Sequence, residues 1–184
     1  MIFTDTHCHL NFDSFLNDIE EVIQRALDNN IERILVPGLD ITTSSQAIDL
    51  AEKHKNVFAA VGFHPNDLSS WQGSESLKIL MTLTQHKKVI AIGEIGLDYY
   101  RNYSTKKKQM QAFKAQLDLA RELQLPVIIH NRDSHQDLME IIQSWYATLE
   151  PKNRLQEHPG VLHSYDGSLE FAWDVIKMNF FLGI

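Results

Sequence analysis

The chain has 184 residues, of which 43% are hydrophobic and 22% charged, so its size and composition are those of one globular domain and exclude a disordered or fibrous protein. Its formal charge of −7 argues against a protein that holds nucleic acid on a broad basic surface. That charge is still compatible with a nuclease whose bound metal ions supply positive charge locally.

The sequence carries no sign of membrane attachment or secretion. No apolar run approaches the roughly 20 residues that a membrane span needs. Residues 1–5 lack the basic and apolar parts of a signal peptide. The single cysteine, Cys8, excludes an internal disulfide and fits a reducing compartment. We therefore expect a cytoplasmic enzyme without a membrane contact and without a stable protein partner.

Short runs rich in β-branched residues alternate with longer amphipathic stretches along the chain. The runs predict strands at 2–6, 33–37, 57–63, 89–94, 126–130 and 160–163. Most of them are apolar along their whole length, which is typical of parallel strands that are buried on both faces.

Helices are predicted between these strands. The first has an apolar face that runs from Phe15 to Leu27, and Asp13 or Ser14 is its expected N-cap. Further helices are predicted at 106–123, 133–146 and 168–178, where apolar residues recur on one stripe. We interpret these stripes as faces that pack on the core.

The repeated strand–helix unit predicts an α/β protein, either an open doubly wound sheet or a closed (β/α)₈ barrel. An open sheet of this kind usually has a glycine-rich phosphate loop after its first strand. Here the first strand ends in His7-Cys8-His9, and neither GxGxxG nor a P-loop occurs. The barrel is favoured.

The count of units predicts an incomplete barrel. Six complete βα units are visible, and residues 180–184 are interpreted as a seventh strand. A complete (β/α)₈ barrel typically needs about 250 residues. We therefore expect one domain over residues 1–184 that is truncated at its C-terminus and lacks the eighth unit.

Two histidines at the end of the first strand are the first candidate metal ligands. His7 and His9 are two residues apart, so on a strand their side chains point to the same face, and Cys8 points away. Asp5 shares that face and could orient a ligand. The alternative interpretation is a chance pair of surface histidines. The carboxyl end of a barrel strand favours a site, because barrel active sites lie there.

Three more candidates end other predicted strands. Glu94 interrupts an apolar strand, and a buried carboxylate needs a partner such as a cation. His130 and His163 each follow an apolar run, and each alone could be a core histidine bonded to backbone. Together with the first pair they place ligands at four strand ends. Imidazole and carboxylate ligands suit zinc, manganese or iron, and carboxylate with water suits magnesium.

Several segments then point to a known family. In chain order they are 4–10 (TDTHCHL), 62–65 (GFHP), 93–100 (GEIGLDYY), 130–133 (HNRD) and 160–163 (GVLH). They resemble motifs of the TatD-related metal-dependent deoxyribonucleases, which belong to the amidohydrolase superfamily. The resemblance runs in order over essentially the whole chain.

The resemblance implies two adjacent divalent ions, of zinc, magnesium or manganese. It assigns His7 and His9 to one ion, His130 and His163 to the other, and Glu94 to a bridging position. The family's remaining ligand is an aspartate on the eighth strand that also handles the proton of the attacking water. That aspartate is expected beyond Ile184, so the catalytic residue stays unknown.

Other residues are candidates for substrate contacts. His64, at the end of the third predicted strand, could contact a phosphate or leaving group, or merely pack beside Pro65. Arg132 and Arg101 could hold a phosphate, or serve in structural ion pairs. The dipeptide Tyr165-Asp166 departs from the family pattern and leaves the sixth loop in doubt.

The leading functional prediction is a metal-dependent hydrolase of DNA phosphodiester bonds, of exonuclease type, in which two ions activate water. One alternative keeps the metal site but changes the substrate to another phosphoester or to an aminoacyl-tRNA ester. A second alternative is an inactive truncated fragment.

Overall fold

Seven parallel strands form a single sheet in the computed structural model, which describes residues 1–101 and 103–184. The strands lie in sequence order from β1 to β7 and pair only in parallel. Their bounds are β1 Phe3–Asp5, β2 Ile31–Pro37, β3 Val57–Val61, β4 Val89–Asp98, β5 Val127–Arg132, β6 Gly160–Leu162 and β7 Phe181–Leu182.

An α-helix follows each of the first six strands, and three short 3₁₀ helices lie in the connections. The α-helices are α1 Ile19–Asp28, α2 Ile41–Lys53, α3 Ser74–Leu83, α4 Lys106–Leu123, α5 His135–Ala147 and α6 Leu169–Lys177. The 3₁₀ helices are η1 Asp13–Phe15, η2 Leu68–Ser70 and η3 Arg154–Gln156. The predicted count of six βα units and a seventh strand is confirmed.

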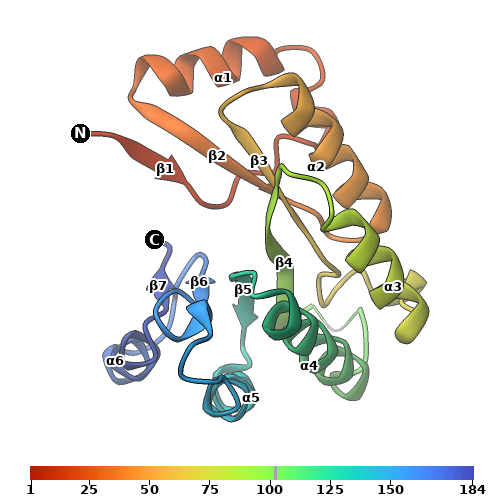
Figure 1. The fold of residues 1–184 in the computed structure, drawn as a ribbon, viewed down its shortest axis with the longest axis vertical. Coiled ribbons are helices and arrows are strands. Elements are labelled where there is room, and N and C mark those ends of the chain that lie inside the picture. The colour runs from red at the N-terminus through yellow and green to blue at the C-terminus, as the bar shows by residue number, and fades with distance from the viewer. Residues whose placement is uncertain (102) are drawn as a thin grey trace.

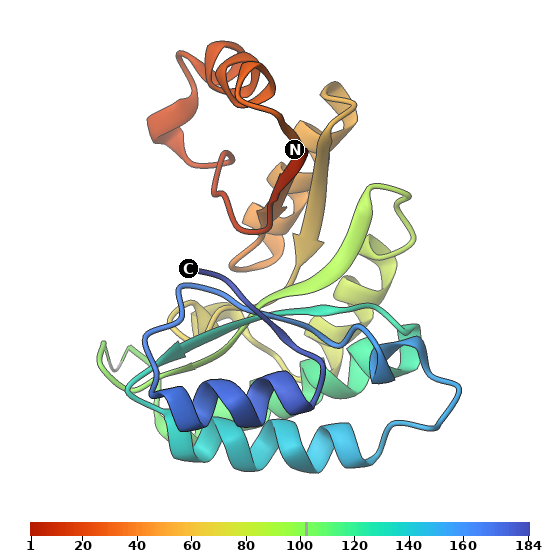
Figure 2. The same ribbon diagram turned by 90° about the vertical axis from the view of Figure 1, so that its left-hand side faces the viewer.

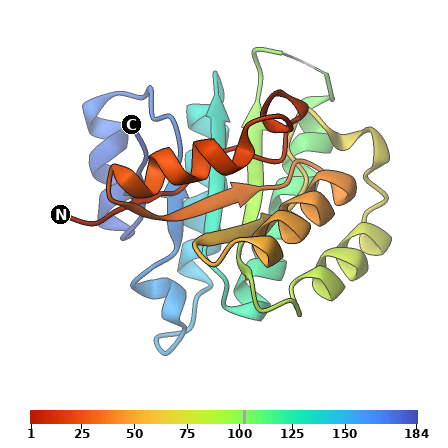
Figure 3. The same ribbon diagram turned by 90° about the horizontal axis from the view of Figure 1, so that it is seen from above.

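The sheet is curled into half of a barrel, with the helices around its outside (Figure 1). Figure 2 shows α4, α5 and α6 as a layer on one side of the strands, with α1 at the opposite end of the molecule. Seen from above, β4 and β5 run side by side between α3 and α6 (Figure 3). Strands that keep their sequence order wind as a barrel does, whereas a doubly wound sheet reverses its order. The predicted barrel architecture is confirmed.

Two apolar clusters lie on opposite faces of the sheet. The larger one fills the space between strands and helices, and it includes Val127 and Ile129 of β5. The smaller one lies on the inner face and comprises Leu35, Ala60, Ala91, Ile128 and Val161. Because strand residues alternate between faces, His130 falls on the same face as Ile128. The end of β5 therefore presents an imidazole to the inside of the curl.

Strand β4 reaches Glu94 through an irregularity. Ile92 and Ile95 both pack in the helix-facing cluster although three positions separate them, and the pairing with β5 shifts register between them. An extra residue in a strand re-aims the side chains beside it. Strict alternation would turn Glu94 toward the helices with Ile92, and the shift instead brings it to the inner site.

Two local predictions were wrong. The first helix does not begin at Asp13 or Ser14, because Asp13–Phe15 is a 3₁₀ turn and α1 starts at Ile19. Two short helical pieces satisfy the apolar spacing that predicted one helix. Strand β1 ends at Asp5, so His7 and His9 lie in the following loop and not on the strand.

No helix among the described residues is long and apolar enough to cross a membrane.

Candidate metal centre

The candidate ligands meet at the carboxyl edge of the sheet because the strand register brings them there. Gly96 of β4 pairs with His130 of β5, and Ile129 pairs with Leu162, which directly precedes His163. The two backbones approach closely: a Cβ on Gly96 would lie 2.0 Å from the His130 carbonyl oxygen, and Gly96 has a φ of +145°. Only glycine fits this position.

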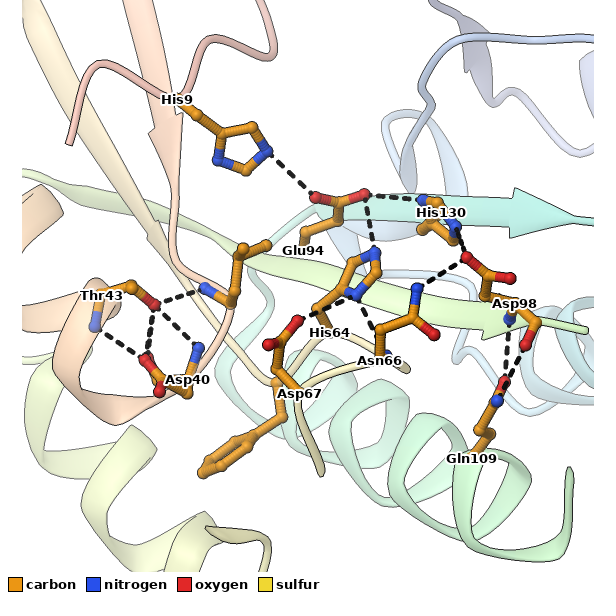
Figure 4. A network of polar contacts seen from close by, with 12 residues as sticks. His9, Asp40, Thr43, His64, Asn66, Asp67, Glu94, Asp98, Gln109 and His130 are labelled. Atoms are coloured by element: carbon orange, nitrogen blue, oxygen red, sulfur yellow. Dashed lines mark hydrogen bonds and ion pairs between the residues drawn. The ribbon is translucent and has the colours of Figure 1, made fainter. Parts of the chain in front are cut away.

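The carboxylate of Glu94 lies at the middle of the cluster, 2% exposed, and faces histidines with both oxygens (Figure 4). Its Oε2 lies 3.4 Å from Nε2 of both His7 and His9. Its Oε1 contacts a second set, at 2.6 Å from His163 Nε2, 2.9 Å from His130 Nδ1 and 3.6 Å from His64 Nε2. One buried carboxylate thus stands between two groups of imidazoles.

The imidazole nitrogens also face one another. His7 Nε2 and His9 Nε2 are 3.0 Å apart, and His130 Nδ1 and His163 Nε2 are 3.2 Å apart. Nδ1 of His7 and Nδ1 of His9 are buried without a hydrogen-bond partner among the described residues. Converging nitrogens around a carboxylate are the donor set that a divalent cation prefers. The residues present therefore fit a metal centre.

The atoms that could hold a metal ion divide into two sets of three that share Glu94. One set comprises His7, Glu94 and His163, and the other comprises His64, Glu94 and His130. The resemblance instead pairs His7 with His9 and His130 with His163. The rings of His7 and His163 stack at a centroid distance of 3.8 Å, so His163 lies beside the first set. Both divisions give Glu94 the bridging position.

The cluster shifts the ionisation of its members in opposite directions. Burial lowers the pKa of His7 to about 3, and the attraction of Glu94 offsets this only in part. Burial alone would lower the pKa of His130 too, but hydrogen bonds and charge from Glu94 and Asp98 raise it. Burial opposes ionisation of Glu94, yet its bonds to His130, His163 and His9 hold its pKa well below the ordinary value. The carboxylate is ionised and His7 is neutral.

Asp98 also belongs to this site, although the sequence did not predict that it positions a ligand. It is 1% exposed, and its Oδ2 lies 3.2 Å from His130 Nε2 and 2.7 Å from the Asn66 amide nitrogen that donates to it. Its Oδ1 accepts from the backbone N–H groups of Tyr100 and Arg101. These bonds outweigh burial and lower the pKa of Asp98. Its place four residues after Glu94 was the available signal.

Two buried glutamines of α4 hold the loops that carry site residues. Gln109 accepts from the Asp98 N–H at 2.8 Å and donates to the Asp98 carbonyl at 2.8 Å. Gln116 does the same for Phe63, which precedes His64, at 2.7 Å and 3.1 Å. Both glutamines are fully buried. The sequence feature that could have revealed them is a glutamine on the apolar stripe of a predicted helix, repeated after seven positions.

The predicted substrate residues lie in different places. His64 is inside the cluster and 8% exposed, and it lines a cavity of about 490 Å³ together with the ligands. Arg101 lines that cavity as well. Arg132 lies outside the set of described residues that line it. Its guanidinium lies 3.7 Å from Asp166 and 5.2 Å from the ring centroid of Tyr100.

With this geometry established, comparison with known proteins identifies the family. Residues 4–184 match the family described as TatD related DNase. The chain belongs to this family. The uncharacterized metal-dependent hydrolase YabD of Bacillus subtilis (strain 168) is 41% identical over 182 residues, which cover 99% of this chain and 68% of that protein.

Other TatD-family proteins give the same picture. The 3′-5′ ssDNA/RNA exonuclease TatD of Citrobacter koseri is 36% identical over 98% of this chain and 66% of its own length. The crystal structure of YJJV, a TatD homolog from Escherichia coli K12, superposes with a TM-score of 0.85 at 32% identity, covering 99% of this chain and 67% of that one. The chain thus spans about two thirds of the length of these relatives.

Proposed function

We propose that this TatD-family chain carries the metal centre of a nuclease that hydrolyses DNA phosphodiester bonds from a chain end with two divalent ions. The observation that carries the proposal is Glu94, because its two carboxylate oxygens face two different groups of histidines. The name of the Citrobacter relative supports a nucleic-acid substrate and 3′-5′ polarity.

The proposed ligands follow from the side of Glu94 on which each lies. His7 and His9 would hold one ion beside Oε2, and His130 and His163 the other beside Oε1. Divalent ions at such a site lower the pKa of water and stabilise negative charge on the attacking and leaving oxygens. The imidazole-rich set favours zinc or manganese, and the bridging carboxylate also suits magnesium.

The residues around the ligands fix which nitrogen of each ring is available. His130 Nε2 faces Asp98, so a hydrogen bond there leaves the lone pair of Nδ1 directed at Glu94 and His163. His64 differs, because its Nδ1 accepts from the Asn66 N–H at 3.1 Å. Asp67 Oδ2 lies 3.4 Å from the same Nδ1, but the bond from Asn66 is the shorter contact, so the ring N–H is assigned to Nε2, which faces the cavity side of Glu94.

His64 therefore acts in this proposal as a donor to the substrate and not as a metal ligand. Its Nε2–H would bond a phosphoryl oxygen and help to orient it beside the ions. Arg101, on the wall of the same cavity, would hold the neighbouring phosphate. Positive charge from the ions and from Arg101 is needed locally because the whole chain carries −7.

The decisive experiment removes the bridging charge. Metal-stripped protein is supplied with Mg²⁺, Mn²⁺ or Zn²⁺ and incubated with single-stranded DNA that carries a label at either end. We expect metal-dependent hydrolysis, stepwise from the 3′ end, and roughly a 100-fold or greater loss in Glu94→Gln. The matched control is Glu52→Gln, because Glu52 pairs with His86 at 2.8 Å away from the site.

Metal content gives a second readout that does not depend on turnover. Elemental analysis should find two equivalents bound to the wild-type protein and to Glu52→Gln, and fewer than one bound to Glu94→Gln. Turnover of an aminoacyl ester without cleavage of DNA would contradict the nuclease proposal. A single tightly bound equivalent would contradict the two-ion site.

A further inference from the structure

Two aromatic side chains from distant segments line the cavity over the proposed metal centre. Phe12 comes from the loop after β1, and Tyr103 comes from the loop between β4 and α4. Their side chains share the lining of the 490 Å³ cavity with His7, His9 and Glu94. Single exposed aromatic residues are ordinary on a surface, so their position at this cavity is what calls for an explanation.

Both rings have accessible surface beside the ligands. Phe12 is 38% exposed, and it stacks on the imidazole of His9 with a centroid distance of 4.5 Å and an interplanar angle of 6°. Tyr103 is 71% exposed. An apolar ring that remains in water next to a charged site gains free energy when a flat partner covers it. A nucleobase is such a partner, and it is attached to the phosphate that the centre would hydrolyse.

A cation lies on the same wall as Tyr103. Arg101 lines the cavity, and its backbone N–H donates to Asp98 Oδ1 at 2.8 Å. That bond holds the Arg101 backbone, from which the side chain extends, beside the site. Arg101 lines a cavity that is also lined by an aromatic ring and the candidate ligands, so its guanidinium could bind a phosphate next to a stacked base.

Tyr100 shows that exposure on this loop is not enough. It is 66% exposed, close to the value for Tyr103, but its ring lies against the Arg132 guanidinium at 5.2 Å. Tyr100 is also outside the set of described residues that line the cavity. The chain therefore offers two tyrosines of similar exposure in one loop, of which one faces the site.

We infer that Phe12 and Tyr103 form a base-stacking subsite for a single-stranded nucleic-acid end, with Arg101 on its phosphate. The inference rests on the proposed nuclease function and adds the residues that would hold an unpaired base beside the metal centre. An unpaired end can offer the face of a base to an aromatic ring, whereas bases inside a duplex are already stacked on each other. Because every base has such a face, the subsite should bind different sequences with similar affinity.

Binding without turnover tests the subsite directly. The anisotropy of a fluorescent thymidine hexanucleotide is measured in EDTA with the wild-type protein, with Phe12→Ala and with Tyr103→Ala. We expect each substitution to weaken binding roughly tenfold, and Tyr103→Trp to restore it. Tyr100→Ala is the matched control and should stay within about twofold of wild type. An abasic hexamer should bind weakly and respond little to Tyr103→Ala.

The outcomes separate this inference from the proposed function. Equal losses in Tyr103→Ala and Tyr100→Ala, or binding of the abasic hexamer as tight as that of the thymidine hexamer, would overturn the stacking subsite and leave the nuclease proposal intact. If the wild-type protein does not bind the thymidine hexamer, the subsite is also refuted. If DNA is bound through Tyr103 but Glu94→Gln retains full hydrolysis, the subsite stands and the proposed metal mechanism fails.

Discussion

The two sides of the proposed metal centre are built differently, although histidines from both sides face the same carboxylate. On the β4–β5 side, Asp98 faces the outer nitrogen of His130, and Gln109 holds both backbone groups of Asp98. On the β1 side, Nδ1 of His7 and Nδ1 of His9 are buried without a partner among the described residues. One side is fixed by hydrogen bonds before any cation binds, and the other relies on packing.

The strands explain this difference. Strand β4 has ten residues and is buried along nearly its whole length, between β3 and β5. Strand β1 has three partly exposed residues and lies at the edge of the sheet. His7 is held by its backbone N–H, which donates to Asp5 Oδ1 at 3.0 Å, whereas Nδ1 of its ring has no partner among the described residues. A ligand whose second nitrogen lacks a partner is oriented less firmly before metal binds.

The largest loss of stability is expected from Gln109→Leu, which removes the bonds that distinguish the β4–β5 side. The substitution leaves a buried N–H and a buried carbonyl of Asp98 without partners, and each unsatisfied group costs about 1–3 kcal/mol. We expect the free energy of unfolding to fall by about 3 kcal/mol in urea denaturation. On the β1 side, Asn11→Ala removes one partly buried bond to the Thr43 carbonyl and should cost about 1 kcal/mol.

Gln111→Leu is the matched control on the same helix, because Gln111 is exposed two residues away. It should change the free energy of unfolding by less than about 0.5 kcal/mol. If Gln109→Leu lowered the free energy of unfolding no more than Gln111→Leu, the bonds from Gln109 to Asp98 would not hold the end of β4.

A second effect is the pH dependence of the stability of the metal-free protein. His7 on one side and His130 on the other should change the free energy of unfolding in opposite directions as the pH rises. The pKa of His7 is lowered from 6.5 to about 3, so between those values the unfolded chain binds a proton that the native state refuses. Stability must then fall as pH drops below 6.5. The pKa of His130 is raised, so the native state keeps a proton that the unfolded chain releases, and stability falls as pH rises above 6.5.

Urea denaturation in EDTA across this range measures both slopes. Between pH 6.5 and 4.5, His7→Asn should remove about 2 kcal/mol of the acid-side loss. Above pH 6.5, His130→Asn should flatten the alkaline-side loss. His158→Asn is the control, because His158 is exposed in a loop far along the chain. If the free energy of unfolding depended on pH in the same way in all variants, the predicted electrostatic difference between the two sides would be wrong.

The same comparison shows how far the sequence could predict this site. The repeated strand–helix unit without a glycine-rich loop was sufficient to predict the barrel. Apolar runs that end in His or Glu were sufficient for the ligand candidates, because parallel strands share a carboxyl edge. The register shift before Glu94 left no pattern in the sequence, since the run from Val89 to Ile95 is apolar on both sides of it. The end of β1 was missed because Thr6 and His7 continue an extended pattern without a breaker.

Residues that act through other residues were harder to predict. Gln109 and Gln116 lie on the apolar stripe of α4, but the stripe does not show which groups they bond, and only the packing of α4 against β4 and the loop after β3 shows their partners. Asp98 is part of the family motif at 93–100, but its bond to His130 depends on the register of two strands that are separated by a whole helix in the chain. Periodicity finds the core and strand ends, and it does not find cross-strand pairs of polar groups.

The smallest of the three effects concerns the affinity for metal, and it tests the comparison at the ligands themselves. Asp98→Asn keeps the size of the side chain but removes the charge beside His130 Nε2, so the ring is oriented less firmly and is a weaker base. We expect roughly a tenfold loss of affinity for the ion held by His130, measured as Mn²⁺ binding by competition with a chelator.

Asp5→Asn is the counterpart on the other side. Asp5 contacts the backbone of His7 and not its ring, so this change should weaken binding of the other ion by less than about threefold. Because two ions are expected, the titration of Asp98→Asn should resolve one unaltered class of site and one weakened class. Equal weakening of both classes in Asp98→Asn, or a larger loss in Asp5→Asn, would mean that the two sides respond as one unit and that the hydrogen bond to His130 does not distinguish them.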